Sequence, residues 1–154
     1  MARSTPGVLL GILSRAASAT VQPDGGGACV VAKKLSDSLA IEWVVGIASV
    51  SDAIEQATSV LQSRGFDHLF SQASSTTERG WRVVLEAHYK THGGKLRTSN
   101  GCGFNDASAE TAEALAVSDP RSYSWGWKRE YVNEKVAVKG YCSKQTGTMA
   151  SSNL

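Results

Sequence analysis

One pattern constrains the fold of this chain more than any other, because it occurs twice. Two β-rich runs joined by a turn are followed by a helix-forming segment at residues 28–64, and the same order returns at residues 81–117. A hairpin becomes stable in water only when further strands or a helix cover its apolar face. The sequence therefore predicts an α+β fold, a two-layer sandwich in which an antiparallel sheet carries two helices on one face.

The first hairpin is predicted from residues 28–34 and 39–48, joined by the turn-forming residues Ser36-Asp37-Ser38. Glu42 is the only charged residue of the second run. Because this run is apolar on both faces, it is typical of a strand in the middle of a sheet. A short strand at residues 66–70 and a polar connection follow the helix.

The helix of the first unit is predicted over residues 52–64. Ser51 and Asp52 are suitable N-caps, and Glu55 completes a capping box. Gly65 supplies the stop at the C-terminal end. The expected buried face follows helical spacing and consists of Ala53, Ile54, Ala57, Val60 and Leu61.

The second hairpin is predicted from residues 81–92 and 95–104, with Gly93-Gly94 as the turn. This turn places Leu85 beside Cys102 on the core face. The opposite face then carries basic side chains that we expect to face solvent and to form a candidate binding surface: His88, Lys90, His92, Lys95 and Arg97.

The remaining segments define the limits of the domain. A helix from Asn105 or Asp106 to Val117 should stop before Asp119-Pro120, and a half-buried strand follows at residues 134–142. We expect a single α+β domain over residues 28–142, a flexible or targeting arm at 1–27 and a disordered tail at 143–154. Residues 28–70 and 80–142 are candidates for an internal repeat.

An aromatic segment lies between the second helix and the last strand. If residues 121–129 are extended, three aromatic rings project from one side and alternate with small residues. Such a strip can stack on bases, sugars or a partner's side chains. We take it, with its flanking cations, as the main candidate binding site: Arg121, Tyr123, Trp125, Trp127, Lys128 and Arg129. The alternative is that these rings cover one end of the core.

No catalytic or metal-binding set is recognisable in the sequence, so we predict no cofactor. Cys29, Cys102 and Cys142 form no C-x-x-C pair. We expect buried structural cysteines, with Cys102 and Cys142 as neighbours that can bridge and Cys29 unpaired. His88 and His92 lie about 13 Å apart on a strand, too far to share a metal ion.

Three features follow one another along the chain. They are a helix ending at Arg64-Gly65, a strand leading into Gly93-Gly94-Lys95, and an Ala-rich helix that opens with Gly101-Cys102-Gly103-Phe104-Asn105. Through these residues, the segment 52–117 resembles a double-stranded-RNA-binding domain. The resemblance implies a related α+β fold. Asp106 and Ala107 stand where that family has its phosphate-binding Lys-Lys pair, so RNA binding does not follow from the fold alone.

Charge and composition limit the classes of function that the chain can have. A net charge of +2 is too small to indicate a nucleic-acid or membrane surface, and no apolar run approaches the about 20 residues of a membrane span. Arg15 and the short apolar run before it favour a cytoplasmic protein over an export or organelle signal in residues 1–23. We predict a small non-catalytic binding domain for a protein or nucleic acid. The alternatives are an RNA-binding module and a small hydrolase using His88 or a cysteine.

Overall fold

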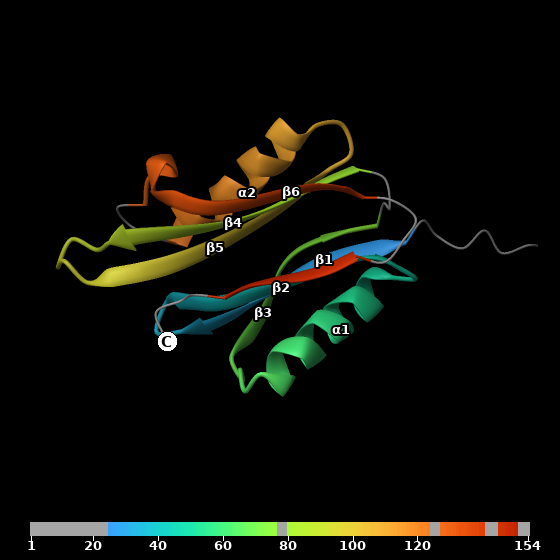
Figure 1. Cartoon of the computed structure of the whole chain (residues 1–154), viewed down its shortest axis with the longest axis horizontal. Helices are drawn as coiled ribbons and strands as arrows, with labels where there is room; N and C mark the ends of the chain where they lie inside the picture. The colour runs from blue at the N-terminus through green and yellow to red at the C-terminus, as the bar shows by residue number, and fades with distance from the viewer. Residues whose placement is uncertain (1–24, 77–79, 124–126, 141–144, 151–154) are drawn as a thin grey trace, which may run out of the picture.

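The structure, a computed structural model, describes residues 25–76, 80–123, 127–140 and 145–150. Its elements follow the order β-β-α-β twice, and a further strand comes after them (Figure 1). The first unit consists of β1 (Gly26–Lys34), β2 (Asp37–Ile47), α1 (Val50–Ser63) and β3 (Leu69–Ser75). The second consists of β4 (Gly80–Lys90), β5 (Leu96–Asn105), α2 (Ala109–Tyr123), the 3-10 helix η1 (Arg129–Tyr131) and β6 (Val132–Gly140), and β7 (Gln145–Ala150) follows it.

Both units pair their strands in the same way. In each unit the first two strands form an antiparallel hairpin, and the strand after the helix pairs antiparallel with the first strand. β7 then pairs with β2, so the two sheets have the orders β3-β1-β2-β7 and β5-β4-β6. The predicted hairpin-plus-helix pattern, occurring twice, is confirmed. Residues 52–117, which carry the resemblance to an RNA-binding domain, are divided between the two sheets.

The two sheets stack face to face, and each carries its helix on the outer side (Figure 1). Three clusters of buried side chains fill the spaces between these layers: one under α1, one under α2 and one between the sheets. The predicted α+β class with antiparallel strands and two helices is confirmed. The layering is α/β/β/α rather than one sheet with both helices on one face, because β1, β2 and β4 bury side chains on both faces and need a cover on each.

The ends of α1 show which capping signals the chain uses. Ser49, rather than the predicted Ser51 or Asp52, is the N-cap, because its Oγ accepts a hydrogen bond from the Asp52 N–H at 3.0 Å. The Asp52 carboxylate in turn accepts from the Ser49 hydroxyl at 2.7 Å. Gly65, with a φ of 90°, ends the helix as predicted.

The register of the β4–β5 hairpin differs by one residue from the prediction. Leu85 lies opposite Gly101, whereas Cys102 lies opposite Val84 on the other face. The loop explains the difference, because the Thr91 N–H donates to the Lys95 carbonyl at 2.9 Å. Three residues therefore form the loop instead of two, with Gly94 at a φ of 79°. A shift of one residue moves Cys102 to the opposite face of the sheet from Leu85.

Two glycines of β5 determine how closely α2 approaches the sheet. A Cβ atom at Gly101 would lie 1.9 Å from the Ala116 carbonyl oxygen, and one at Gly103 would lie 2.0 Å from that of Ala112. Only glycine lets the helix backbone lie this close, with Cα–H groups directed at the helix carbonyls.

Both ends of α2 differ from the prediction. Ser108 is the N-cap, since its Oγ accepts from the Thr111 N–H at 3.1 Å, while Asn105 forms a turn just before the helix. The helix also continues through Pro120. Pro120 removes the N–H that would bind the Ala116 carbonyl, and this carbonyl faces Gly101 instead.

Strands also form where the sequence predicts none. β3 continues to Ser75, and β7 lies in the tail, residues 143–154, that we expected to be disordered. β7 is polar, but Gly147 lies opposite Trp43. A Cβ at Gly147 would lie 2.0 Å from the indole ring, so the ring covers this glycine and holds the strand in place.

Candidate functional site

The turn between β1 and β2 exposes a leucine in an unusual backbone conformation. Leu35 and Ser36 have positive φ angles of 49° and 71°, as in a two-residue type I′ turn. Glycine and asparagine adopt these angles readily, whereas a bulky residue there costs about 1 to 3 kcal/mol. Leu35 is 78% exposed, so packing within the chain does not compensate for this cost. A strained and exposed apolar residue makes this turn a candidate contact surface.

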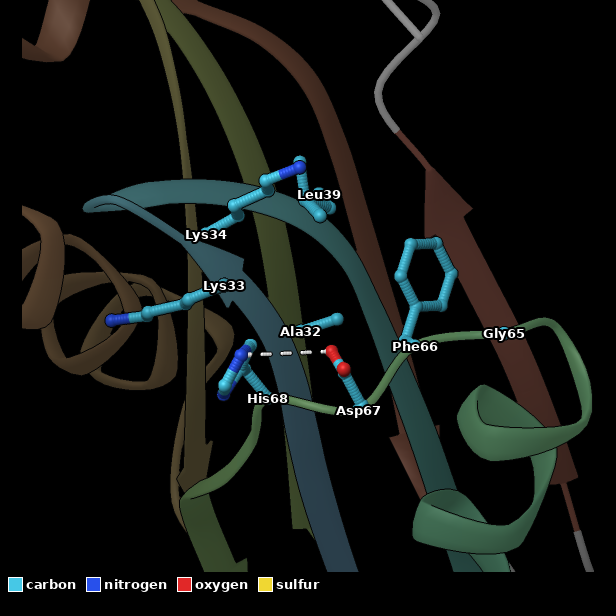
Figure 2. A pocket seen from close by; sticks show the side chains of 8 residues that line it. All are labelled: Ala32, Lys33, Lys34, Leu39, Gly65, Phe66, Asp67 and His68. Atoms are coloured by element: carbon cyan, nitrogen blue, oxygen red, sulfur yellow. Dashed lines mark ion pairs between the residues drawn. The ribbon is translucent and has the colours of Figure 1, made fainter.

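Leu35 borders a hollow whose other large apolar residue is Phe70 of β3, 54% exposed. This hollow has a volume of about 590 Å³, and a neighbouring hollow of about 400 Å³ continues along the loop after α1 (Figure 2). Both are lined by Lys33, Lys34 and His68. The surface thus combines apolar side chains with basic ones.

The loop that carries His68 is fixed by backbone hydrogen bonds. After α1 the N–H groups of Gly65 and Phe66 donate to the carbonyls of Gln62 and Leu61, at 2.9 and 3.1 Å. The Lys33 N–H donates to the His68 carbonyl at 2.9 Å and ties the loop to β1. His68 Nε2 lies 3.8 Å from Asp67 Oδ1, and both side chains are largely exposed (Figure 2).

The β4–β5 hairpin reaches the same end of the molecule (Figure 1). The Arg97 guanidinium donates to the Leu35 carbonyl and forms an ion pair with Asp37 at 2.9 Å. Leu96, next to Arg97, is 50% exposed. We name the surface formed by these neighbouring elements the hairpin patch, and define it as Lys33, Lys34, Leu35, His68, Phe70 and Leu96.

The basic hairpin face predicted from the sequence is not a single solvent-facing surface. With the observed register, His88 lies opposite Thr98 and Arg97 lies opposite Tyr89, so these two basic residues occupy different faces of the sheet. His88 is directed at the space between the sheets, and Arg97 is held by Asp37. Lys90, His92 and Lys95 are exposed near the turn, as expected.

The aromatic segment also differs from the extended strip that the sequence suggested. Arg121 and Tyr123 belong to α2, and Trp125 lies outside the described residues. Trp127 is 7% exposed and packs in the core under α2, so the alternative that the rings cover the core holds for this residue. Lys128 and Arg129 are exposed, and the Arg129 guanidinium pairs with Glu113.

Charged side chains lie between the two sheets as well. Arg82 is 3% exposed, and its guanidinium carbon lies 5.3 Å from the centre of the Trp43 ring. Burial lowers the pKa of Arg82 to about 10, so the group remains charged at neutral pH and interacts with the ring as a cation. This contact joins β4 of the second unit to β2 of the first.

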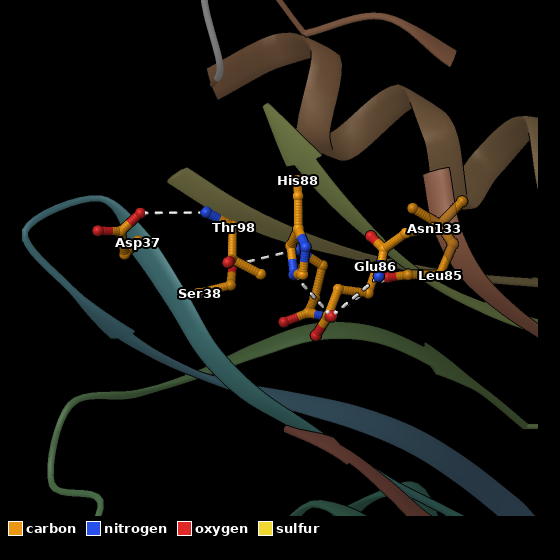
Figure 3. Close-up of polar contacts among 8 residues, drawn as sticks. Asp37, Ser38, Leu85, Glu86, His88, Thr98 and Asn133 are labelled. Carbon is orange, nitrogen blue, oxygen red and sulfur yellow. Dashed lines mark hydrogen bonds and ion pairs between the residues drawn. The ribbon is translucent and has the colours of Figure 1, made fainter. Parts of the chain in front are cut away.

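A second polar group lies further along β4. Glu86 and Asn100 lie directly opposite each other, 3% and 1% exposed. His88 Nε2 lies 3.0 Å from Glu86 Oε1 (Figure 3). The Asn100 N–H donates to Ser38 Oγ at 3.2 Å. We name Glu86, His88 and Asn100 the inner polar cluster.

The cysteine pairing is a correction to the sequence analysis. Cys29 of β1 and Cys102 of β5 form a disulfide with a Cα–Cα distance of 6.4 Å, whereas we expected Cys29 to be unpaired. Both side chains face the space between the sheets, which a single-sheet expectation could not foresee. Neither bridged cysteine can act as a thiol nucleophile. Cys142 lies outside the described residues.

Among the residues that the structure describes, no three His, Cys, Asp or Glu side chains are grouped to hold a metal ion. No described helix is both long enough and apolar enough to cross a membrane. Comparison with protein-family models, curated proteins and solved structures found no match for this chain. The site must therefore be interpreted from its own chemistry.

Sequence reasoning missed the hairpin patch because it placed the turn at Ser36-Asp37-Ser38. The observed turn contains no Gly, Asn or Asp at its two central positions, Leu35 and Ser36. Phe70 was assigned to a short strand without any sign of its face. The predicted register of the second hairpin placed Leu96 on the apolar face, whereas it is 50% exposed. Only the isolated leucine between two lysines and a serine gave a signal, since apolar residues are uncommon in tight turns.

Proposed function

We propose that this chain is a non-catalytic protein-interaction domain whose hairpin patch binds an acidic segment of a partner protein that carries an apolar side chain. The observation that supports this most is Leu35, 78% exposed in a conformation that costs conformational energy. Because packing within the folded domain does not compensate for this cost, a contact with a partner protein would explain why Leu35 stands at this position.

The exposure of the apolar residues favours a protein over a small molecule. Small-ligand pockets enclose most of the ligand's surface, about 70 to 90%. Leu35, Phe70 and Leu96 are instead between 50% and 78% exposed, so they project from the surface. Projecting apolar side chains are suited to enter pockets on another protein, where buried anchors supply most of the binding energy.

The charge of the patch favours an acidic segment. Lys33, Lys34 and His68 line both hollows, and Asp67 is the one acidic side chain that lines either of them. Exposed lysines attract carboxylates over about 8 to 10 Å at moderate salt, so they increase the rate of association and select against basic partners.

The experiment is an NMR titration of the full chain with a synthetic peptide of alternating Glu, Leu and Phe. A peptide of the same apolar residues with Lys in place of Glu is the counterpart. We expect shifts confined to the hairpin patch, saturation with a Kd below about 1 mM for the acidic peptide, and weaker binding at higher salt.

Variants distinguish specific binding at the hairpin patch from non-specific binding elsewhere on the surface. Leu35→Ala should weaken binding of the acidic peptide at least about fivefold, whereas Leu115→Ala, which also removes an exposed leucine, should leave it unchanged. Lys34→Glu should weaken binding, and Lys128→Glu should not. Equal binding of both peptides, tighter binding of a single-stranded RNA at the same patch, or shifts elsewhere would contradict the proposal.

A further inference from the structure

The inner polar cluster combines three side chains that the strand register brings to one point. Glu86 and His88 are two residues apart on β4 and therefore share a face, and Asn100 of β5 lies directly opposite Glu86. The Asn100 N–H bonds to Ser38 of β2, so this face is the one that meets the other sheet. The cluster is therefore held by both units of the molecule.

The ligand-type atoms of this cluster lack hydrogen-bond partners. Glu86 Oε2, Asn100 Oδ1 and His88 Nε2 are buried, and no group among the described residues forms a hydrogen bond with them. A buried carboxylate oxygen without a partner is costly, more so than a neutral group. With the His88 proton on Nδ1, each of these three atoms carries a free electron pair, and none of them has a cation or a hydrogen-bond donor beside it.

The contact between His88 and Glu86 has the distance of a hydrogen bond but not its direction. His88 Nε2 lies 3.0 Å from Glu86 Oε1, yet a hydrogen placed on this nitrogen would not point at the oxygen, so the two atoms form no hydrogen bond. Two ligand atoms at about 2.1 Å from one ion lie about 3.0 to 3.4 Å apart, depending on the geometry. The separation therefore suits two ligands of a common cation.

We propose that Glu86, His88 and Asn100 form a binding site for a divalent transition-metal ion. An imidazole nitrogen, a carboxylate and an amide oxygen form a mixed set that suits Zn²⁺, Co²⁺ or Mn²⁺, whereas Mg²⁺ and Ca²⁺ prefer oxygen ligands alone. Asn133 supports the set, because its Nδ2 donates to Glu86 Oε1 at 3.4 Å. The His88 side chain is 27% exposed, which gives an ion and its remaining water ligands access.

This site is separate from the hairpin patch and does not depend on the proposed partner binding. It also differs from the His88 and His92 pair excluded by the sequence, because the second ligand is the carboxylate two residues away on the same face. Its third ligand is an amide oxygen, so the site is consistent with the absence of three grouped His, Cys, Asp or Glu side chains among the described residues.

The test is a titration of the full chain with Co²⁺, followed by absorbance, and with Zn²⁺, followed by calorimetry. We expect one ion per chain, and an increase in Tm of about 5 to 10 °C when free Zn²⁺ is one hundred times its Kd. Mg²⁺ should bind at least about tenfold more weakly. NMR of the histidine ring nitrogens should show that His88, and neither His68 nor His92, changes on binding.

Ligand variants sharpen the test. Glu86→Gln and His88→Ala should each weaken Zn²⁺ binding at least about a hundredfold, while His92→Ala, an exposed histidine near the turn, serves as the matched control. Asn100→Asp should strengthen binding, since it replaces an amide ligand with a charged one. No binding by the wild-type chain would mean that water alone satisfies the cluster, and binding that survives both ligand variants or moves the ring signals of another histidine would also overturn the proposal. If the ligand variants do not fold, the ring signals of the wild type decide.

Discussion

The two β-β-α-β units share one strand order but present different chemistry to each other. The inner face of the first unit is mainly apolar, with Val31, Ile41 and Trp43 around Cys29, and its polar side chains Ser38 and Gln72 hydrogen-bond to the Asn100 backbone. The second unit places Arg82, Glu86 and Asn100 on its inner face beside Val84. The same topology therefore supplies a mainly apolar cover in one unit and a polar cluster in the other.

The helices and turns of the two units differ in the same way. α1 packs by the side chains of Ala53, Ala57 and Leu61, whereas α2 lies against bare backbone at Gly101 and Gly103. The turn of the first hairpin places Leu35 at a positive φ, whereas the second uses Gly94 there. The first unit therefore packs its helix through side chains but has a strained turn. The second unit packs its helix against bare backbone and places glycine at the positive φ of its turn.

The largest effect should come from the bond between the units. Replacing both Cys29 and Cys102 by Ser opens a link across 73 residues of chain, and the free energy of unfolding should fall by about 4 kcal/mol. Urea unfolding followed by circular dichroism measures this loss, and reduction of the wild-type protein should reproduce it. A loss under about 1 kcal/mol would mean that the two inner faces associate without the bond.

The next largest effect concerns the contact between α2 and β5. Gly103→Ala should lower the free energy of unfolding by about 2 to 3 kcal/mol, because the new Cβ would meet the Ala112 carbonyl at 2.0 Å. Gly93→Ala is the control, because nothing lies within 4 Å of the added atom. If both variants unfold at the same urea concentration, α2 does not lie on bare backbone and the contrast with α1 disappears.

The turns allow a test in the direction of increased stability. Leu35→Asn combined with Ser36→Gly supplies the residues that a type I′ turn prefers, and should raise the free energy of unfolding by about 1 kcal/mol. Gly94→Ala in the second hairpin should instead lower it by a similar amount, because Gly94 has a φ of 79°. Thermal unfolding of both variants measures these changes. If the variant with Leu35→Asn and Ser36→Gly were no more stable than the wild type, the first turn would not be strained.

The smallest effect is a pH dependence of opposite sign in the two units. Burial raises the pKa of Glu42 in β2, although the Thr148 hydroxyl opposes the shift. The folded state then binds the Glu42 proton more tightly than the unfolded state does. The ionised Glu42 carboxylate therefore lowers the free energy of unfolding at neutral pH, and this loss disappears as pH falls through the raised pKa. Glu42→Gln should therefore stabilise the chain at pH 7 and have little effect at pH 3.

Glu113 of α2 should behave in the reverse manner. Hydrogen bonding from Lys135, at 2.9 Å, lowers the pKa of Glu113, and Arg129 adds to the effect. Its contribution to stability is present above the pKa of the unfolded chain, about 4.5, and is lost as pH falls through the lower folded value. Glu113→Gln should cost less than about 1 kcal/mol at pH 7 and nothing near pH 3. The urea midpoints of Glu42→Gln and Glu113→Gln at pH 7 and pH 3 test this pair of predictions. A shift of both midpoints in the same direction at pH 7 would contradict it.

Local pattern predicted much of the fold. Helical spacing located α1, the apolar run with Glu42 located β2, and both hairpins followed from alternating strands and turns. The register of β5 was wrong because a loop of two residues and one of three leave the same sequence signal at Gly93-Gly94. Polar β7 escaped prediction because its pairing depends on Trp43, about 100 residues earlier in the chain.

The candidate sites were less accessible to sequence reasoning. A tryptophan such as Trp127 suits both a binding strip and a core, so the sequence does not distinguish the two. Its exposure of 7% in the structure places it in the core. The inner polar cluster needs the stacking of two sheets, because a charged residue on a strand normally indicates a solvent face. Short-range pattern contains no information about which strand faces meet.

Peptide mapping under non-reducing conditions tests the face-to-face arrangement of the two units most directly. Trypsin places the three cysteines in separate peptides, residues 16–33, 98–121 and 140–144. Alkylation before digestion blocks any free thiol and prevents exchange. We expect a cross-linked pair of the first two peptides, joined through Cys29 and Cys102. A link between Cys102 and Cys142, or three alkylated cysteines, would contradict it.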